Sequence, residues 1–268
     1  MNVLAWAGSA IASGIRDVGR SAISVLEELG ALTILSGRIF RSFIPPTLDG
    51  RETWRAFYKV GVKSYAIVVM TAMFTGAIMV IQAGQFVAKA SATSFVGWAA
   101  GFAVLAEIGP VLIGLMFSGR VGANNTAELG TMVVTEQVDA LRALAIEPMH
   151  YLVAPRVLAM VVMLFLLTAL GDLFALLGGA ITSELLLDVP MRVFIQQVVD
   201  ANLVDEYLLG LVKGSVFGLS IAIVSCHFGL TVSGGAVGVG RAVNNAVVVA
   251  AIGIFVTDLA VGLTWNFL

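Results

Sequence analysis

The chain has 268 residues, of which 59% are hydrophobic and only 12% are charged, and its mean hydropathy is +0.99. A water-soluble domain does not carry that much apolar surface, so the composition excludes this class and indicates a polytopic membrane protein. The single cysteine, Cys226, excludes an internal disulfide and a site with several cysteine ligands. The two histidines, His150 and His227, lie far apart in the sequence, so no metal centre is expected.

The first sixty residues carry an amphipathic pattern and then a break. From Ile11 to Leu32 the apolar residues recur at intervals of three and four, which is the pattern of one helix face. Basic residues follow, and they suit a membrane leaflet that contains anionic lipids. The pattern predicts a helix lying in the membrane interface, although a soluble packing helix has the same periodicity. Pro45 and Pro46 then predict a short elbow.

Five later segments are apolar and long enough, at roughly 20 residues or more, to cross the hydrocarbon core of a bilayer. Pro110 lies inside the second of them and predicts a kink, because proline removes a backbone hydrogen bond. The sequence therefore predicts an interfacial helix and elbow in residues 1–60 and a five-span region in residues 61–268. The spans cover about residues 62–87, 94–118, 154–182, 206–230 and 243–267.

The distribution of basic residues predicts the orientation in the membrane. The loop between the third and fourth spans is acidic and suits the outer side. Only Lys89, Arg192 and Lys213 then fall outside or near the outer end of a span. The basic residues predict a cytoplasmic N-terminus, and five spans then place the C-terminus on the outer side of the membrane. The basic residues on the cytoplasmic side are Arg16, Arg20, Arg38, Arg41, Arg51, Arg55, Lys59, Lys63, Arg120, Arg142, Arg156 and Arg241.

A polar stretch of about forty residues, 117–159, separates the second and third spans. Within it, Asn125 and Glu128 have capping-box-like spacing, and Glu147-Pro148 predicts a stop, because the residue before proline avoids the helical region. The spacing predicts an amphipathic helix over about residues 125–146. This helix is either a solvated connector or a helix that docks into a partner.

The residues of this stretch carry a resemblance. The string GRVGANNTAELGTMVVTEQVDALRALAIEPMHYLVAPRVLA resembles the signature of MlaE/YrbE-type permeases, the membrane subunits of ABC transporters that move lipids between membranes together with MCE proteins. The resemblance continues upstream through Glu107-Ile108-Gly109-Pro110-Val111, which is similar to the family's E-L-G-P-V motif. It covers essentially the whole chain as a single permease domain, 1–268.

The resemblance implies an all-α polytopic fold, with an N-terminal amphipathic interfacial helix, five transmembrane helices and a cytoplasmic coupling helix between the second and third spans. It also implies a homodimer, a cytoplasmic ABC ATPase bound to each copy, an MCE-domain protein on the outer face, and a lipid substrate rather than a nucleic acid. No G-x-x-x-x-G-K-S/T phosphate loop occurs in the sequence. We therefore expect a non-catalytic permease with no cofactor of its own, and ATP and Mg²⁺ on the partner ATPase.

The resemblance also implies which residues contact the ATPase. Charged side chains of the coupling helix would dock by ion pairs and hydrogen bonds, and apolar side chains would anchor the contact. The candidates are Glu128, Thr135, Glu136, Val138, Asp139, Ala140, Leu141 and Arg142.

Four ionisable residues lie within predicted spans, where a charge is expensive and indicates function by default. Glu107 either shapes a lipid pocket or makes a structural hydrogen bond to a neighbouring helix, and Ala106 stands where related permeases often carry a basic partner for it. Asp172, Lys213 and Asp258 lie towards the outer halves of their spans. For these three, interhelical ion pairing or reaching the outer interface is weighed against a direct substrate role.

By analogy with the family, the first and second spans line the lipid pocket. The first span is rich in methionine and phenylalanine, which is typical of packing and of lipid contact, and which would also suit a pliable wall around acyl chains. The candidate lipid-binding residues are Phe74, Ile78, Ile81, Leu105 and Glu107.

Two other functions are compatible with a five-span protein. A secondary transporter driven by an ion gradient usually contains inverted repeats, and no convincing internal repeat is present. A membrane-embedded enzyme would need converging catalytic side chains, and neither a Ser-His-Asp set nor paired carboxylates are evident within the spans. An ATP-driven lipid permease is the leading hypothesis, and the secondary transporter of a hydrophobic substrate is the alternative.

Overall fold

The computed structural model describes residues 19, 23, 26–43, 50–89, 95–265 and 267. Within these ranges the chain is helical and contains no strand, which confirms the all-α prediction. The predicted beginning of the first helix and the elbow at Pro45-Pro46 lie outside the described residues. Among the described residues, five helices are long and apolar enough to cross a membrane: Gly50–Gly84, Val96–Val134, Met149–Leu187, Val204–Leu230 and Gly235–Trp265.

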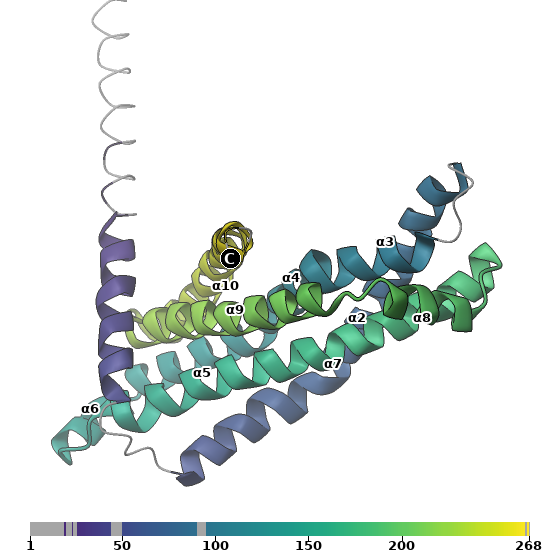
Figure 1. Ribbon diagram of the computed structural model, residues 1–268. Helices are drawn as coiled ribbons and strands as arrows, with labels where there is room; N and C mark the ends of the chain where they lie inside the picture. The colour runs from purple at the N-terminus through teal and green to yellow at the C-terminus, as the bar shows by residue number, and fades with distance from the viewer. Residues whose placement is uncertain are drawn as a thin grey trace, which may run out of the picture.

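The long helices form an elongated bundle (Figure 1). Helix α7 (Ala154–Leu187) lies in the middle, between α2 (Gly50–Lys89) and α9 (Val204–Leu230). Helix α10 (Gly235–Trp265) crosses α9 and the second span. Two short helices mark the ends of the bundle, α6 (Gln137–Ala143) and α8 (Met191–Asp200). We refer to these as the α6 end and the α8 end.

The N-terminal helix, residues 26–42, runs across the α6 end of the bundle (Figure 1). Leu35 and Ile39 are buried in the main core, so the helix is attached to the spans through one face. Leu29, Ile34 and Phe40 remain exposed on its other faces. A helix that lies across the span ends and keeps apolar side chains on its surface is suited to the membrane interface.

The second span is one continuous helix with two π-helical turns. Helix α3 (Val96–Ala103) passes through the first π turn into α4 (Gly109–Phe117), and the second π turn, Ser118–Gly122, leads into α5 (Ala123–Val134). The first π turn precedes Pro110, where the sequence predicted a kink. There the N–H of Gly109 donates to the carbonyl five residues earlier, which accommodates a proline that cannot donate.

Each of the three π turns in the described chain carries an ionisable residue. Glu107 lies on Val104–Ile108, Arg120 lies on the turn before α5, and His150 lies on Met149–Val153 before α7. An inserted residue shifts the register of a helix and points a side chain away from the regular stripe, and such turns are frequent at functional sites. The π turns therefore make these three side chains candidates for functional residues.

The connection between the third and fourth spans differs from the expected acidic loop, because it contains α8. Phe194 of this helix is buried in a small core cluster with Val96 and Ala100 of α3. Arg192 and Asp200 lie at the surface of α8 together with Val193, Ile195 and Val199, so the helix closes the α8 end of the bundle with a mixed polar and apolar outer face. The helix depends on one buried aromatic contact, which sequence spacing alone does not reveal.

Helices α2 and α7 approach each other through glycines. A Cβ atom at Gly76 would overlap the carbonyl oxygen of Ala175, and one at Gly178 would overlap the carbonyl oxygen of Met73. Backbone atoms of one helix thus fill the space that a side chain would need on the other. Small residues at such crossings let membrane helices pack by close van der Waals contact.

We expect Gly76→Val to separate α2 from α7 and to lower stability by about 1–3 kcal/mol, because the obstructing atom belongs to the backbone and cannot rotate away. The midpoint of thermal unfolding in detergent measures the effect. Gly240→Ala is the matched control, because nothing lies near a Cβ at Gly240, and it should leave the midpoint unchanged or raise it. Equal midpoints for Gly76→Val and wild type would show that the crossing is loose.

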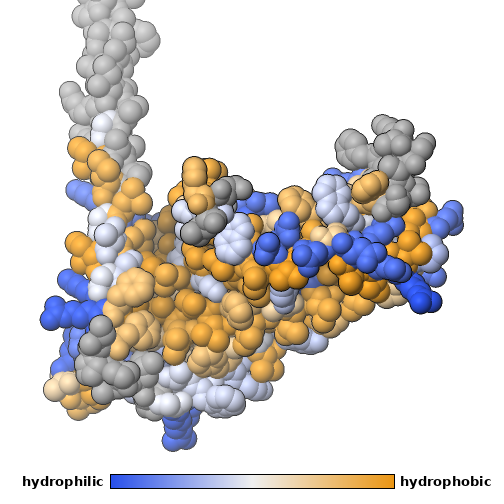
Figure 2. All heavy atoms as spheres, viewed as in Figure 1, coloured by the Kyte–Doolittle hydropathy of each residue, from blue (hydrophilic) through white to orange (hydrophobic). Residues whose placement is uncertain are grey.

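Apolar side chains cover most of the flank of the bundle (Figure 2). The exposed residues include Phe74, Ile78 and Ile81 on α2 and Ile252, Phe255 and Leu259 on α10. In the most apolar 18-residue segment of α10, only 17% of the residues are buried inside the chain. A surface this apolar is stable next to lipid or next to another membrane helix, but not in water.

Candidate functional site

The polar stretch between the second and third spans forms two helices, whereas the sequence predicted one over about residues 125–146. Helix α5 continues the second span, and α6 follows as a separate helix of seven residues. The break lies at Glu136, whose φ of 59° is in the left-handed region and interrupts the helical hydrogen bonds. The periodicity of the sequence continues across the break and therefore does not reveal it.

A Schellman motif ends α6. The N–H of Ile146 donates to the carbonyl oxygen of Leu141 at 2.9 Å, and the N–H of Ala145 donates to the carbonyl oxygen of Arg142 at 3.0 Å. Ala145 takes the left-handed conformation, with φ of 57°, that glycine usually takes at this position. Helix α6 is thus held between two left-handed residues at one extremity of the bundle (Figure 1).

The two sides of α6 differ in character. Val138 is only 4% exposed and belongs to the main core, and Leu141 packs against that core. Both residues anchor α6 to its own bundle, so Val138 does not offer an apolar contact to a partner in this conformation. On the other side, Asp139 and Arg142 form an exposed ion pair at 2.8 Å. Leu144, directly after the helix, is 70% exposed and presents an apolar side chain at this surface.

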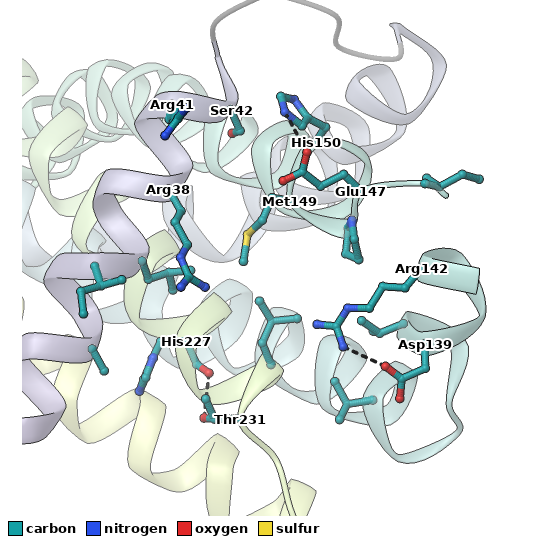
Figure 3. Close-up of a pocket in the computed structure, with 18 of the residues that line it drawn as sticks. Arg38, Arg41, Ser42, Asp139, Arg142, Glu147, Met149, His150, His227 and Thr231 are labelled. Atoms are coloured by element: carbon teal, nitrogen blue, oxygen red, sulfur yellow. Dashed lines mark hydrogen bonds and ion pairs between the residues drawn. The ribbon is translucent and has the colours of Figure 1, made fainter. Parts of the chain in front are cut away.

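A cavity of about 1140 Å³ lies between the N-terminal helix, α6, the segment that precedes α7 and the end of α9. In Figure 3 the side chains of Arg38 and Arg142 extend into it from opposite sides. Arg41 and Ser42 of the N-terminal helix and Asp139 of α6 also line it. Within the described residues, Arg38 and Arg41 form no ion pair. The N-terminal helix and α6 therefore both contribute to the lining of this cavity, which is rich in arginine.

Two histidines that line this cavity lie close to carboxylates. His227, at the end of α9, lies 2.9 Å from Glu28 of the N-terminal helix, and His150, on a π turn, lies 3.4 Å from Glu147. The His227 contact ties the N-terminal helix to the fourth span. Both contacts lie at the α6 end.

The structure distributes the predicted partner-contact residues over two surfaces. Thr135, Glu136, Asp139, Ala140 and Arg142 are exposed on or beside α6. Glu128 lies on α5 instead, where its carboxylate pairs with Lys59 of α2 and lies 3.6 Å from Arg156 of α7. Its contacts are with the spans and not with α6.

The predicted capping pair is absent. Asn125 donates from Nδ2 to the hydroxyl of Ser225 on α9 at 2.9 Å and accepts from Arg156 through Oδ1. This asparagine is buried and joins three helices, because α5 begins earlier than the sequence suggested. Its role is therefore interhelical and not that of a helix cap.

A second cluster of charges lies within the spans. Lys213 of α9 is fully buried, and its ammonium group lies 2.7 Å from the Glu107 carboxylate and 2.9 Å from the Asp258 carboxylate of α10. The predicted interhelical ion pairing is confirmed for Lys213 and Asp258. Lys213 supplies the basic partner that Ala106 cannot, and the short distances place Lys213 and Asp258 at the depth of Glu107.

Asp172 behaves differently from this cluster. It is fully buried and forms no ion pair or hydrogen bond within the described residues. For Asp172 the predicted ion pair or contact with the outer interface is therefore wrong. Its carboxylate lies in a space that Gly109 and Gly210 leave open, since a Cβ at either glycine would lie within 4 Å of it.

The predicted lipid-contact residues do not form one surface. Phe74, Ile78 and Ile81 are exposed along α2, and Glu107 is 52% exposed at its side chain. Leu105 is buried on the inner side of the second span and presents no surface to a ligand in this conformation. The groups of His, Cys, Asp and Glu in the described chain form no cluster that could hold a metal ion.

Sequence reasoning did not identify Arg38, Arg41 and Leu144 as parts of the site. The two arginines were counted only for orientation, although their spacing of three residues would place them on one face of a helix. Leu144 carried the signal of an apolar residue outside the buried stripe of α6.

Comparison with known proteins identifies the family. The family model described as "Permease MlaE" matches residues 53–264. A protein of Rickettsia felis named "Probable ABC transporter permease protein" is 36% identical over 242 residues, which cover 90% of this chain and 93% of that protein. A probable ABC transporter permease protein of Synechocystis is 36% identical over 232 residues, 87% of this chain and 88% of that protein.

A plant protein is also similar. "Protein TRIGALACTOSYLDIACYLGLYCEROL 1, chloroplastic" of Arabidopsis thaliana is 30% identical over 228 residues, which cover 85% of this chain and 65% of that protein. The match to the family model, over residues 53–264, includes α6 and the Glu107 region. On the family match and the extent of these similarities, the chain belongs to the MlaE family of ABC transporter permeases.

Proposed function

We propose that this chain is the permease subunit of an ATP-driven transporter that moves lipid, of the phospholipid class, between a bacterial inner membrane and an MCE partner protein. The observation that carries the proposal is α6, a separate helix at one extremity of the bundle with an exposed polar side. A permease of the ABC class works with ATPase subunits, and the sequence contains no phosphate loop of its own.

In the proposed arrangement, α6 docks into a cytoplasmic ATPase. Asp139 and Arg142 face the partner with Thr135, Glu136 and Ala140 beside them, and Leu144 supplies an apolar contact. Val138 and Leu141 fix α6 to the spans, so that a movement of the ATPase reaches the bundle as a rigid-body displacement. The α6 end then lies in the cytoplasm and the α8 end in the periplasm, where the MCE protein would bind.

Lipid is the proposed cargo for two reasons. The name of the Arabidopsis relative contains that of a glycolipid, trigalactosyldiacylglycerol. In this chain, Phe74, Ile78 and Ile81 line an exposed apolar face of α2, and Glu107 is half-exposed. A homodimer would cover part of the apolar surface of α2 or α10 and would leave a space for acyl chains between the copies.

The proposal is tested by reconstituting the permease with an ABC ATPase and an MCE protein from the same organism, in vesicles that contain fluorescent phospholipid. We expect lipid transfer to the MCE protein that requires ATP hydrolysis and is insensitive to a proton ionophore. The ATPase should copurify with the permease. Because the ATPase binds to a protein surface, its association should not depend on the presence of labelled lipid.

The opposite result would favour a secondary transporter. Transfer that continues without ATP and stops with the ionophore would contradict the proposal, as would purification of the native assembly without any ATPase. A permease that copurifies with an ATPase but moves no phospholipid would keep the ABC assignment and refute the cargo.

A further inference from the structure

A second cavity, of about 600 Å³, lies at the α6 end between α2, α5 and the beginning of α7. We call it the basic crevice. It is separate from the cavity of Figure 3, since the two share no lining residue. Its apolar walls come from Val60, Pro155 and Met160, and its polar lining includes Asn124 and Asn125.

The basic crevice carries an excess of positive charge. Five basic side chains and two carboxylates line it, which is a net charge of +3. The carboxylates are both engaged: Glu52 pairs with Arg55 at 2.7 Å, and Glu128 pairs with Lys59. The basic residues are Arg55, Lys59, Lys63, Arg120 and Arg156.

Two of the basic side chains have no anionic partner. Neither Lys63 nor Arg120 forms an ion pair within the described residues. The Nη1 atom of Arg120 is also buried without a hydrogen-bond acceptor. Leaving a guanidinium donor buried and unpaired is costly, and the oxygens of a phosphate, like those of a carboxylate, match the planar guanidinium.

The local backbone explains why Arg120 points here. Arg120 lies on the π turn Ser118–Gly122, which shifts the register of the second span before α5 begins. A regular helix would carry the side chain along the stripe of its neighbours. The π turn therefore holds a basic side chain in a crevice that already contains four others.

Exposed aromatic residues beside the basic crevice indicate that it lies at the depth of the lipid headgroups. Trp54 and Tyr58, on the same turns of α2 that line the crevice, are 75% and 57% exposed. Exposed tryptophan and tyrosine side chains are enriched where a span leaves the hydrocarbon and enters the headgroup layer. The N-terminal helix, which also keeps apolar residues exposed, lies across the same end.

We propose that the basic crevice binds the phosphate group of an acidic phospholipid from the leaflet at the α6 end. Arg120 and Lys63 contact the phosphate oxygens, and Arg156, held by a hydrogen bond to Asn125 at 2.9 Å, adds a third positive charge. The acyl chains lie outside, along the apolar surface of α2. The site is distinct from the Glu107 cluster. Lipid binding there does not require transport, so this proposal can be correct even if the proposed function is wrong.

The test uses the full-length permease in nanodiscs of phosphatidylcholine with a stepped fraction of phosphatidylglycerol, and native mass spectrometry to count retained phosphatidylglycerol. We expect Lys63→Gln and Arg120→Gln each to weaken retention about tenfold, as expected for the loss of one charge-assisted contact. Lys63 is exposed, so its replacement keeps the fold even if Arg120→Gln does not. Glu128→Gln removes a competing carboxylate, frees Lys59 and should strengthen retention.

Arg192→Gln is the matched control, because Arg192 is an exposed arginine on α8 at the opposite end. It should leave retention unchanged. Equal losses for Arg192→Gln and Lys63→Gln would overturn the proposal, because they would show that overall charge alone attracts the lipid. Retention of phosphatidylcholine equal to that of phosphatidylglycerol would also overturn it. Displacement of phosphatidylglycerol by soluble glycerol 3-phosphate at equal concentration would assign the crevice to a free phosphate and refute the lipid.

Discussion

Exchanging the charges of α6, with Asp139→Lys and Arg142→Glu together, is expected to weaken binding of the ATPase about 100-fold, since opposing like charges in an interface costs several kcal/mol. Both side chains are exposed and lie 2.8 Å apart. The exchange keeps an ion pair within α6 and keeps the net charge, so the helix itself loses only a few tenths of a kcal/mol from the reversed order of charges. Transport should fall to the level seen without ATP.

The measurement is copurification of the ATPase with the permease, followed by ATP-dependent lipid transfer in vesicles. Arg192→Glu with Asp200→Lys is the matched control, because it reverses two exposed charges on α8 at the other end of the bundle. The control should retain the ATPase. Normal ATPase binding by the α6 variant would show that α6 is a solvated connector, the alternative that the sequence left open.

Replacing the buried lysine, with Lys213→Met, is expected to lower stability by about 3–5 kcal/mol, because it leaves charged carboxylates without their partner inside the spans. Asp258 contributes most of this loss, since its side chain is 19% exposed, whereas Glu107 is 52% exposed and solvent can compensate for part of its charge. Equilibrium unfolding in detergent and the thermal midpoint measure the effect.

A rescue experiment separates the ion pairs from simple packing. Adding Glu107→Gln and Asp258→Asn to Lys213→Met removes the uncompensated charges, and we expect most of the lost stability to return. Lys63→Met, at an exposed lysine, is the control and should change the midpoint little. A Lys213→Met protein as stable as wild type would show that the cluster does not hold α9 to its neighbours. Failure of the triple variant to recover would indicate that the lysine stem is needed for packing.

The spans were predictable because their signal is local and strong. An apolar segment of sufficient length can be buried in lipid or in the bundle, and in both cases it becomes a helix that satisfies its own backbone. The five predicted spans accordingly agree with the five long helices of the structure. The predicted apolar stripe of the first helix ended at Leu32, whereas the residues that attach this helix to the core are Leu35 and Ile39, and its interfacial position stays a prediction.

The division of the polar stretch was not predictable, because the break at Glu136 is a matter of one backbone dihedral. Glutamate has no preference for the left-handed region, so nothing in its identity marks the position. The break assigns Glu128 to the spans and Asp139 to α6, although both belong to one periodic face in the sequence. Val138 likewise turns inward because the core of the bundle is beside it.

The partners of the buried charges were equally hidden. Glu107 and Lys213 lie more than a hundred residues apart, and no spacing rule connects them. Ala106 made Glu107 look unpaired, whereas the fold supplies a lysine from α9. Asp172 shows the reverse, since a carboxylate that was expected to pair is enclosed without a partner in the described chain.

The sequence by itself determined the class of the molecule, the number of spans, the family and the polar stretch on which the proposed coupling depends, because hydrophobicity, charge and motif are properties of neighbouring residues. Only the tertiary structure decided which charges meet, where α6 begins and which cavities exist. Ion pairs and cavities are formed by residues from different helices. The positions of these residues depend on how the helices pack, as at the close α2–α7 crossing at Gly76, and on local backbone geometry, as at the π turn that carries Arg120. The basic crevice follows from these packing details and from no local pattern in the chain.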